Sequence, residues 1–185
     1  MLRHKEIDTQ LTLPANPSLG SPKNTLIVEI TPDQVESTEV RAVFAIWQQH
    51  KGSRAMPSRD EVLPRPLGKL LRTISLVRVM PETNDYELRI VGDAHVQAYG
   101  TNSQGMTLSD ITTASPEFVA ALKYSYDLVC ARRAPIGYRG IMGRDLSHAR
   151  FDWFETLYLP LGVDGDVEFI LNASVYQPRN GKWPD

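Results

Sequence analysis

Hydrophobic and polar residues alternate most regularly in the last third of the chain, between Phe151 and Tyr176. From Phe151 to Leu161 every second residue is apolar except Glu155, and a period of two places these residues on one side of a β-strand. Residues 162–166 contain glycines and aspartates that favour a turn, and a second alternating run follows them. The pattern predicts a β-hairpin whose apolar side other elements must cover.

A second hairpin and a long helix are predicted before this one. A polar loop at 81–85 separates two β-prone runs, and a helical stripe of apolar residues follows Ser115-Pro116. Strands are expected at 73–80, 86–91 and 134–142, a short helix at 93–99, and the longest interior helix from Pro116 to Arg132. This long helix is the natural cover for the sheet.

An amphipathic helix is predicted ahead of both hairpins. Thr31-Pro32-Asp33-Gln34 combines a capping box with proline at the first helical position, and Gly52 stands where a left-handed cap would end the helix. Because an isolated helix of this length is marginal in water, its apolar stripe must pack against the outer face of the sheet, a second copy of the chain or a partner. The stripe consists of Val40, Val43, Phe44 and Trp47.

The patterns divide the chain into four parts. Residues 1–30 are rich in proline and small polar residues and are expected to form a mobile arm, although the β-prone run Thr25 to Ile30 leaves an additional edge strand open. Residues 31–72 form a helical extension, residues 73–176 the main domain and residues 177–185 a tail. A length of 185 residues, 42% of them hydrophobic, suffices for one domain with such an appendage.

Charge and cysteine content limit the classes of partner. Twenty basic and twenty-two acidic residues give a net charge of −2, which provides no electrostatic footprint, so we expect no nucleic-acid partner and no membrane partner. The single cysteine, Cys130, excludes an intramolecular disulfide and fits a reducing compartment. Since no apolar run is long enough for a signal sequence or a membrane span, we expect a cytoplasmic protein.

Several short motifs accompany this order of elements. They are Trp47 with Gly52 and Pro57, Arg89-Ile90-Val91-Gly92, Tyr99-Gly100, Gly105, and Leu157-Tyr158-Leu159-Pro160-Leu161 followed by an Asp-Gly turn. In these motifs and in its order of strands and helices, the chain from Ala42 to Tyr176 resembles a bacterial PAS family. The resemblance implies an α+β fold, namely a PAS-like five-stranded antiparallel sheet with helices over one face, plus the N-terminal helix.

The same resemblance implies a non-catalytic sensory or interaction module. A cavity between sheet and helices would hold a small molecule, and flanking helices would pass the signal to other signalling proteins. In PAS proteins a helix that precedes the domain frequently packs against its equivalent in a second subunit. We therefore favour a homodimer or partner docking, through Val40, Val43, Phe44 and Trp47, over packing of this helix within the chain.

The ligand-site candidates are polar and aromatic residues expected to face that cavity. They are His95, Tyr99, Tyr126, Tyr138, Trp153 and Glu155. Glu155 shares a predicted face with apolar residues, so it must be ion-paired, protonated, near a strand irregularity or in contact with a ligand. Its candidate ion-pair partners are Arg89, Arg139 and Arg150.

The ligand itself stays unknown, but two common cofactors are disfavoured. Haem-binding PAS domains commonly place an axial histidine on the long helix, and residues 116–132 contain none. Flavin-binding light sensors of this kind use a cysteine on an earlier helix, and residues 93–111 contain none. The four histidines and one cysteine are too scattered for metal-ligand spacing, so no metal is expected.

The competing hypothesis is an enzyme. A small α+β cone fold of the cyclase or isomerase type has a similar length and uses a His-Asp pair as acid and base, for which His95 with Asp93 or Asp110 is the nearest candidate. These residues fall in predicted helices or loops, not on facing strands, and nucleophile motifs of hydrolases are missing. We therefore prefer the sensory module.

Overall fold

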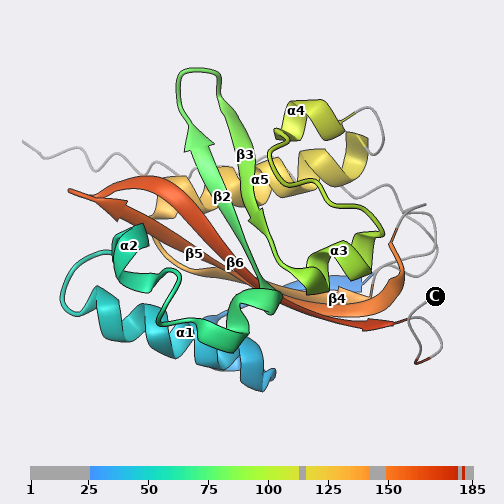
Figure 1. Cartoon of the computed structure of the whole chain (residues 1–185), viewed down its shortest axis with the longest axis horizontal. Coiled ribbons are helices and arrows are strands. Elements are labelled where there is room, and N and C mark those ends of the chain that lie inside the picture. Colours follow the sequence, from blue (N-terminus) through green and yellow to red (C-terminus); the bar gives the residue numbers. More distant parts are fainter. Residues whose placement is uncertain (1–25, 113–115, 142–148, 179–180, 182–185) are drawn as a thin grey trace, which may run out of the picture.

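One twisted sheet carries helices on its two sides (Figure 1). The computed structural model describes residues 26–112, 116–141, 149–178 and 181. Its elements are, in chain order, β1 (Leu26–Ile30), η1 (Pro32–Gln34), α1 (Thr38–Lys51), α2 (Arg59–Val62), η2 (Gly68–Thr73), β2 (Ile74–Met80), β3 (Asp85–Val91), α3 (Asp93–Tyr99), α4 (Leu108–Ile111), α5 (Pro116–Arg132), β4 (Ile136–Ile141), β5 (Phe151–Val163) and β6 (Asp166–Pro178), where η marks a short 3-10 helix.

The sheet is antiparallel throughout, with its strands in the order β1-β4-β5-β6-β2-β3. The C-terminal hairpin predicted from alternation is confirmed and forms the centre of the sheet. Asp164 and Gly165 join β5 to β6 with positive φ angles of 54° and 88°, as a two-residue hairpin turn of this kind requires. The hairpin β2–β3 and the long helix α5 are confirmed as well.

The sheet has one strand more than the five that we expected. β1 pairs with β4, so that Leu26 lies opposite Ile141 and Ile30 opposite Gly137. Residues 26–30 therefore form an edge strand and not part of a mobile arm, because their β-prone backbone finds the open edge of β4. Residues 1–25 of the predicted arm, and residues 179–180 and 182–185 of the predicted tail, lie outside the described residues.

Helices cover both faces of the sheet, not one. α1, α2 and η2 lie on the side that we call the α1 face, and α3, α4 and α5 lie on the side that we call the α5 face. Alternation along β6 separates two environments: Leu171 and Ala173 belong to the core under α1, whereas Asn172 contacts His95 of α3. The N-terminal helix thus closes the face that the resemblance left open.

A register shift between Phe151 and Trp153 sends these two residues to opposite faces. Phe151 packs against Tyr99 and Tyr176 on the α5 face, with ring centroids 5.5 and 4.7 Å away. Trp153 stays in alternation with Glu155 on the α1 face. The prediction that both aromatic residues share one face is wrong, because the extra residue at the shift reverses the side on which the strand's next residue lies.

The apolar stripe of α1 packs against the chain's own sheet. Val40 and Val43 are 0% exposed and Trp47 is 2% exposed, within a core that includes Leu159 of β5. Phe44 is half-buried and stacks on Trp47 with ring centroids 5.9 Å apart. The preferred arrangement, in which a second copy covers the stripe, is therefore wrong for Val40, Val43 and Trp47, because the α1 face already supplies the apolar surface that they need.

Two hydrogen bonds fasten the α1–α2 segment to the end of the central hairpin. Trp47 Nε1 donates to the carbonyl oxygen of Pro160 at 2.8 Å, and the amide of Gly162 donates to the carbonyl oxygen of Pro57 at 3.0 Å. β4 pairs with β5 only as far as Tyr158, so Pro160 lies beyond that pairing, where a missing amide donor is tolerated. Trp47, Pro57 and Pro160, which carried the family resemblance, therefore have a structural role.

The N-terminal helix begins later than its sequence predicts. The capping box from Thr31 to Gln34 forms, but it caps only the 3-10 turn η1. α1 starts at Thr38, where Ser37 Oγ accepts a hydrogen bond from the Val40 amide at 3.2 Å. The chain turns between the two elements, and this turn brings two backbone amides to a buried carboxylate described below.

Candidate functional site

A group of polar side chains is buried on the α5 face, between the central hairpin and α3. Asn172 Oδ1 accepts hydrogen bonds from Thr156 Oγ1 at 2.6 Å and from Ser174 Oγ at 2.8 Å, and the two hydroxyl oxygens lie 2.6 Å apart. These three side chains and that of His95 are each at most 6% exposed. We call Thr156, Asn172, Ser174 and His95 the His95 cluster.

A close backbone approach places His95 over β6. A Cβ atom at Gly92 would lie 2.5 Å from the carbonyl oxygen of Arg72, so only glycine lets the chain pass this near to η2. Gly92 is the N-cap of α3, and Gly100, with a φ of 72°, ends the helix. The first turn of α3 then points His95 at the sheet, where its Nε2 lies 3.3 Å from Asn172 Nδ2.

His95 is buried with one ring nitrogen unpaired. Among the described residues, none hydrogen-bonds its Nδ1. Because Asn172 Oδ1 already accepts from two hydroxyls, its Nδ2 is the donor to His95 Nε2, which assigns the proton of the neutral ring to Nδ1. Burial lowers the pKa of His95 to about 4, so the ring is neutral near pH 7. The unpaired group is therefore a buried N–H donor.

Aromatic rings surround this cluster. Tyr176 meets His95 edge to face, with ring centroids 5.5 Å apart, and Tyr99 contacts Tyr176, Phe118 and Phe151 at 5.8, 5.2 and 5.5 Å. Burial raises the pKa of Tyr176 to about 12 and raises the pKa of Tyr99 well above its usual value. Both phenols are therefore neutral near pH 7.

Three further tyrosines continue this layer beneath α5. Tyr158 of β5 contacts Tyr126 of α5 at 5.4 Å and Tyr138 of β4 at 6.2 Å between ring centroids. Burial is the main cause that raises the pKa of each of these phenols. The tyrosines between the sheet and α5 thus form an uncharged layer that has hydroxyl groups but no ionised ones near neutral pH.

The structure brings together four of the six predicted ligand-site residues. His95, Tyr99, Tyr126 and Tyr138 all lie on the α5 face, in the aromatic and polar layer. Trp153 and Glu155 lie on the α1 face, so neither of them reaches this layer. The six candidates therefore do not share one location, because strand alternation puts Trp153 and Glu155 on the opposite side of the sheet.

Glu155 is fully buried and paired. Its carboxylate oxygens accept hydrogen bonds from the backbone amides of Glu36 and Ser37 at 3.0 and 2.8 Å, just before α1, and Arg139 Nη1 lies 3.4 Å away. The positive end of the helix dipole favours a carboxylate at this place. Of the three candidate partners, Arg139 is the one that reaches it, and Arg89 pairs with Glu87 instead. The geometry supports the ion-pair interpretation of Glu155.

Sequence reasoning missed the strand residues of the His95 cluster. Asn172 and Ser174 occupy the polar positions of an alternating strand, which a hairpin with one covered face would turn toward water. Thr156 lies opposite Ser174 in the register. The sequence did contain one signal for these residues, namely the helix predicted from Pro116. Such a helix must cover a face of the sheet, and polar strand residues on the covered face are then buried.

His95 does not form the acid-base pair with an aspartate that the enzyme hypothesis requires. Its ring lies beside the amide of Asn172, whereas Asp93 is exposed on α3 and Asp110 accepts the Thr107 amide in a capping box of α4 at 2.8 Å. An acid-base pair needs the carboxylate within hydrogen-bond reach of the imidazole. Neither His95 with Asp93 nor His95 with Asp110 is therefore such a pair.

Cys130 belongs to a network that ties β3 to α5. Its sulfur lies 3.8 Å from the Tyr86 hydroxyl, which donates to Asp127 Oδ1 at 2.6 Å, and Lys123 Nζ bonds both oxygens of that carboxylate at 3.1 Å. Burial raises the pKa of the Cys130 thiol. The thiol is consequently protonated near neutral pH and is a poor nucleophile.

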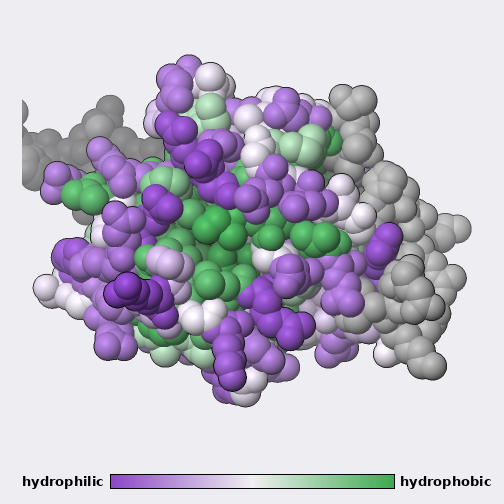
Figure 2. Space-filling model, in the orientation of Figure 1, coloured by the Kyte–Doolittle hydropathy of each residue, from purple (hydrophilic) through white to green (hydrophobic). Residues whose placement is uncertain are grey.

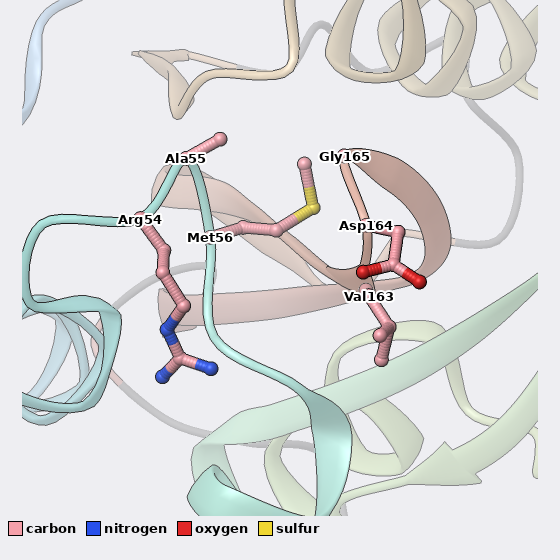
Figure 3. Close-up of a pocket in the computed structure, with 7 residues that line it drawn as sticks. Arg54, Ala55, Met56, Val163, Asp164 and Gly165 are labelled. Carbon is pink, nitrogen blue, oxygen red and sulfur yellow. The ribbon is translucent and has the colours of Figure 1, made fainter.

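A surface pocket of about 360 Å³ lies elsewhere, between the α1–α2 loop and the turn of the central hairpin (Figure 3). Arg54 and Met56 line it from the loop, and Asp164 from the turn. Figure 3 shows the Met56 side chain extending from the loop toward the turn. Arg54 is held within its own segment by Glu61 at 2.8 Å. The one cation in the lining of this pocket is therefore already paired.

Comparison with known proteins identifies the family. A sequence model of the PAS domain matches residues 35–171, which is more than half of the chain. The chain therefore belongs to the PAS domain family. Among curated proteins none matches it. Within the described residues, no helix is both long and apolar enough to cross a membrane, and no three His, Cys, Asp or Glu side chains come together as a metal site would require.

One solved structure is similar in outline. It is described as an RNA-binding light-oxygen-voltage receptor and has a TM-score of 0.45 and 16% sequence identity to this chain. The alignment covers 86% of this chain and 40% of the receptor. Membership in the PAS family identifies the chain as a sensory module.

Proposed function

We propose that this chain is a non-catalytic sensory module that binds a small uncharged molecule at the His95 cluster and signals through contacts with other proteins. The PAS fold supports the general role. The observation that carries the ligand site is the unpaired, buried Nδ1 of His95 among three further polar side chains. A buried donor without a partner costs about 1–3 kcal/mol, so a molecule that supplies an acceptor would recover that free energy.

The chemistry of the layer defines the ligand class. His95 presents an N–H donor, because Asn172 occupies its other nitrogen. The neutral imidazole and the neutral phenols of Tyr99 and Tyr176 provide no charge to balance an ionised ligand. Their rings favour a flat partner through stacked or edge-to-face contacts. We infer an uncharged, planar molecule with a carbonyl or ring-nitrogen acceptor directed at His95 Nδ1.

Native mass spectrometry combined with an absorbance scan tests this proposal on freshly purified, never unfolded protein. The expected result is a retained small molecule that is released on denaturation and has no net charge. His95→Leu removes the donor at similar volume and should abolish retention, whereas the matched control His50→Leu, on α1, should keep it. Retention that is equal in both variants, or protein that binds no uncharged aromatic compound of a metabolite set, contradicts the proposal.

A further inference from the structure

The helices of the α1 face leave one end of that face uncovered. α1 and η2 contact the central hairpin and the beginning of β2, whereas the far part of the β2–β3 hairpin projects beyond them (Figure 1). Where this cover ends, between η2 and the neighbouring strands β3 and β6, four apolar side chains are only half-buried, although they pack against the core of this face. We call them the outer patch: Leu70 and Leu71 of η2, Ile90 of β3 and Phe169 of β6.

The register of the sheet places Ile90 and Phe169 of the outer patch on the same face. Ile90 lies opposite Leu76, Leu76 lies opposite Leu171, and Phe169 is two residues from Leu171 on the same side of β6. Figure 2 shows a hydrophobic area in the middle of this side of the molecule, enclosed by hydrophilic residues. An apolar area with a polar surround is the usual composition of a protein-docking surface.

Three arginines border the outer patch. The guanidinium of Arg59 lies over the Phe169 ring, 5.4 Å from its centroid, and Arg78 is the register partner of Phe169. Arg78 and Arg89 share one carboxylate, that of Glu87, at 3.7 and 2.8 Å. The three arginine side chains are 48%, 50% and 53% exposed, while that of Glu87 is 15% exposed. Arg59 also lies 3.9 Å from the exposed carboxylate of Asp60, so three positive charges border the patch against two negative ones, of which that of Glu87 is largely covered.

The basic character continues along the neighbouring chain. Residues 62–81 contain Arg65, Lys69, Arg72 and Arg78 and no acidic residue, although the whole chain has a net charge of −2. Arg65, Lys69 and Arg72 are exposed. The overall charge therefore conceals a local surface of the opposite sign, and this surface attracts a negatively charged partner.

We propose that the outer patch docks an acidic amphipathic segment of another protein, whose apolar side chains cover Phe169, Ile90 and Leu71 while its carboxylates pair with the arginines. This inference rests on the protein-contact part of the proposed function and names the surface that makes the contact. The apolar centre favours a protein segment over nucleic acid, whose affinity comes mainly from phosphate contacts. Four apolar residues cover less area than a permanent interface needs, so the contact is transient.

The test is selection of a random peptide library displayed on phage against the full chain. The enriched peptides should combine Asp or Glu with Leu, Ile or Phe. Their binding, measured by fluorescence anisotropy, should weaken about tenfold or more for the double variant Arg78→Glu/Arg89→Glu. Phe169→Ala should also weaken it, in protein whose melting curve confirms that it is folded. The matched control Arg132→Glu/Arg133→Glu makes the same charge change at the C-terminal end of α5 and the residue after it, and should bind normally.

Several results would overturn the inference. Enriched peptides that are basic, or that bind the Arg78→Glu/Arg89→Glu variant unchanged, would show that the outer patch is not their site. An RNA oligonucleotide that binds through the same arginines when acidic peptides do not would assign the surface to nucleic acid. A dimer that this variant dissociates would assign it to a second copy. Any of these can occur while ligand retention at His95 is intact, so the two proposals fail separately.

Discussion

The two faces of the central hairpin differ in chemistry although the same two strands build both. On the α1 face, Leu157, Leu159 and Leu171 pack against aliphatic side chains, and the one buried carboxylate, Glu155, is bonded to backbone amides and an arginine. On the α5 face, Thr156 and Asn172 lie among aromatic rings and beside a histidine with an unpaired nitrogen. Among the described residues, His95 Nδ1 on the α5 face is the buried side-chain polar atom without a hydrogen-bond partner, and none of that kind lies on the α1 face.

This difference separates stability from function within one sheet. A polar group buried without a partner costs free energy, and a fold keeps such a group where it has a use. On the α1 face, the buried polar side chains of the described residues already have hydrogen-bond partners, so none of them is left to bind a ligand. The α1 face therefore fastens the N-terminal helix, and the α5 face carries the site that we propose for a ligand. The following changes test whether the two faces behave as differently as this assignment requires.

The largest effect is expected on the α1 face, for Val40→Asp. Val40 is 0% exposed, so the new carboxylate would be buried without a partner, which is expected to cost at least about 4 kcal/mol. Urea unfolding followed by circular dichroism should show a largely unfolded protein. Ala45→Asp, on the exposed side of the same helix, should stay within about 0.5 kcal/mol of wild type. A folded Val40→Asp monomer would mean that the stripe of α1 is not core.

On the α5 face, stability should depend on pH through His95. Its pKa is about 4 in the folded protein and near 6.5 when unfolded. Between these values the unfolded chain binds a proton that the folded chain does not, so stability falls as pH decreases from 6.5 to 4. The effect should reach roughly 3 kcal/mol and be fully absent above pH 6.5.

The measurement is urea unfolding at several pH values for wild type and His95→Leu. The difference between the two proteins isolates the histidine from the carboxylates that titrate in the same range. At pH 7 the variant should stay within about 1 kcal/mol of wild type, because it removes the unpaired His95 Nδ1 donor but also takes the acceptor from Asn172 Nδ2. If both proteins lose stability in parallel as pH falls, His95 is not buried as described.

A smaller loss is expected for Glu155→Gln. The amide keeps one acceptor oxygen for Ser37 but loses the charge that Arg139 and the start of α1 complement, which should cost about 2 kcal/mol. Urea midpoints measure it, with the exposed Glu168→Gln on β6 as the control. Ligand retention in native mass spectra should not change. Loss of ligand without loss of stability would move Glu155 into the binding site.

The smallest effect is expected for Trp47→Phe. The substitution keeps an aromatic ring in the core but removes the indole donor to the Pro160 carbonyl, so the expected loss is about 1 kcal/mol. Thermal melting and urea unfolding at pH 7 would both detect it. No measurable loss would indicate that this hydrogen bond does not fasten the α1–α2 segment.

Local patterns in the sequence predict most of the fold. Strict alternation locates β5 and β6, and the apolar stripe after Pro116 locates α5, because both signals need only neighbouring residues. The edge strand β1 escapes firm prediction since its five residues become a strand only by pairing with β4, more than a hundred residues away. The register shift at Phe151 is equally invisible to a pattern of period two.

The candidate site is only partly predictable for a related reason. His95 and Tyr99 follow from the family resemblance and from their place on a short helix. Asn172 and Ser174 look like solvent-facing residues until α3 and α5 are known to cover that side of the sheet. Glu155 and Trp153 look like cavity residues until α1 is known to cover the other side. Assigning a strand residue to a face requires the tertiary packing of both faces.

A crystal structure of the protein purified without unfolding tests the central claim most directly. The account predicts density for a small molecule on the α5 face, with an acceptor atom about 3 Å from His95 Nδ1 and a flat group against Tyr99 or Tyr176. A ligand bound on the α1 face near Trp153 and Glu155 would contradict the account. So would a single water molecule as the only partner of His95 Nδ1 in protein saturated with its ligand.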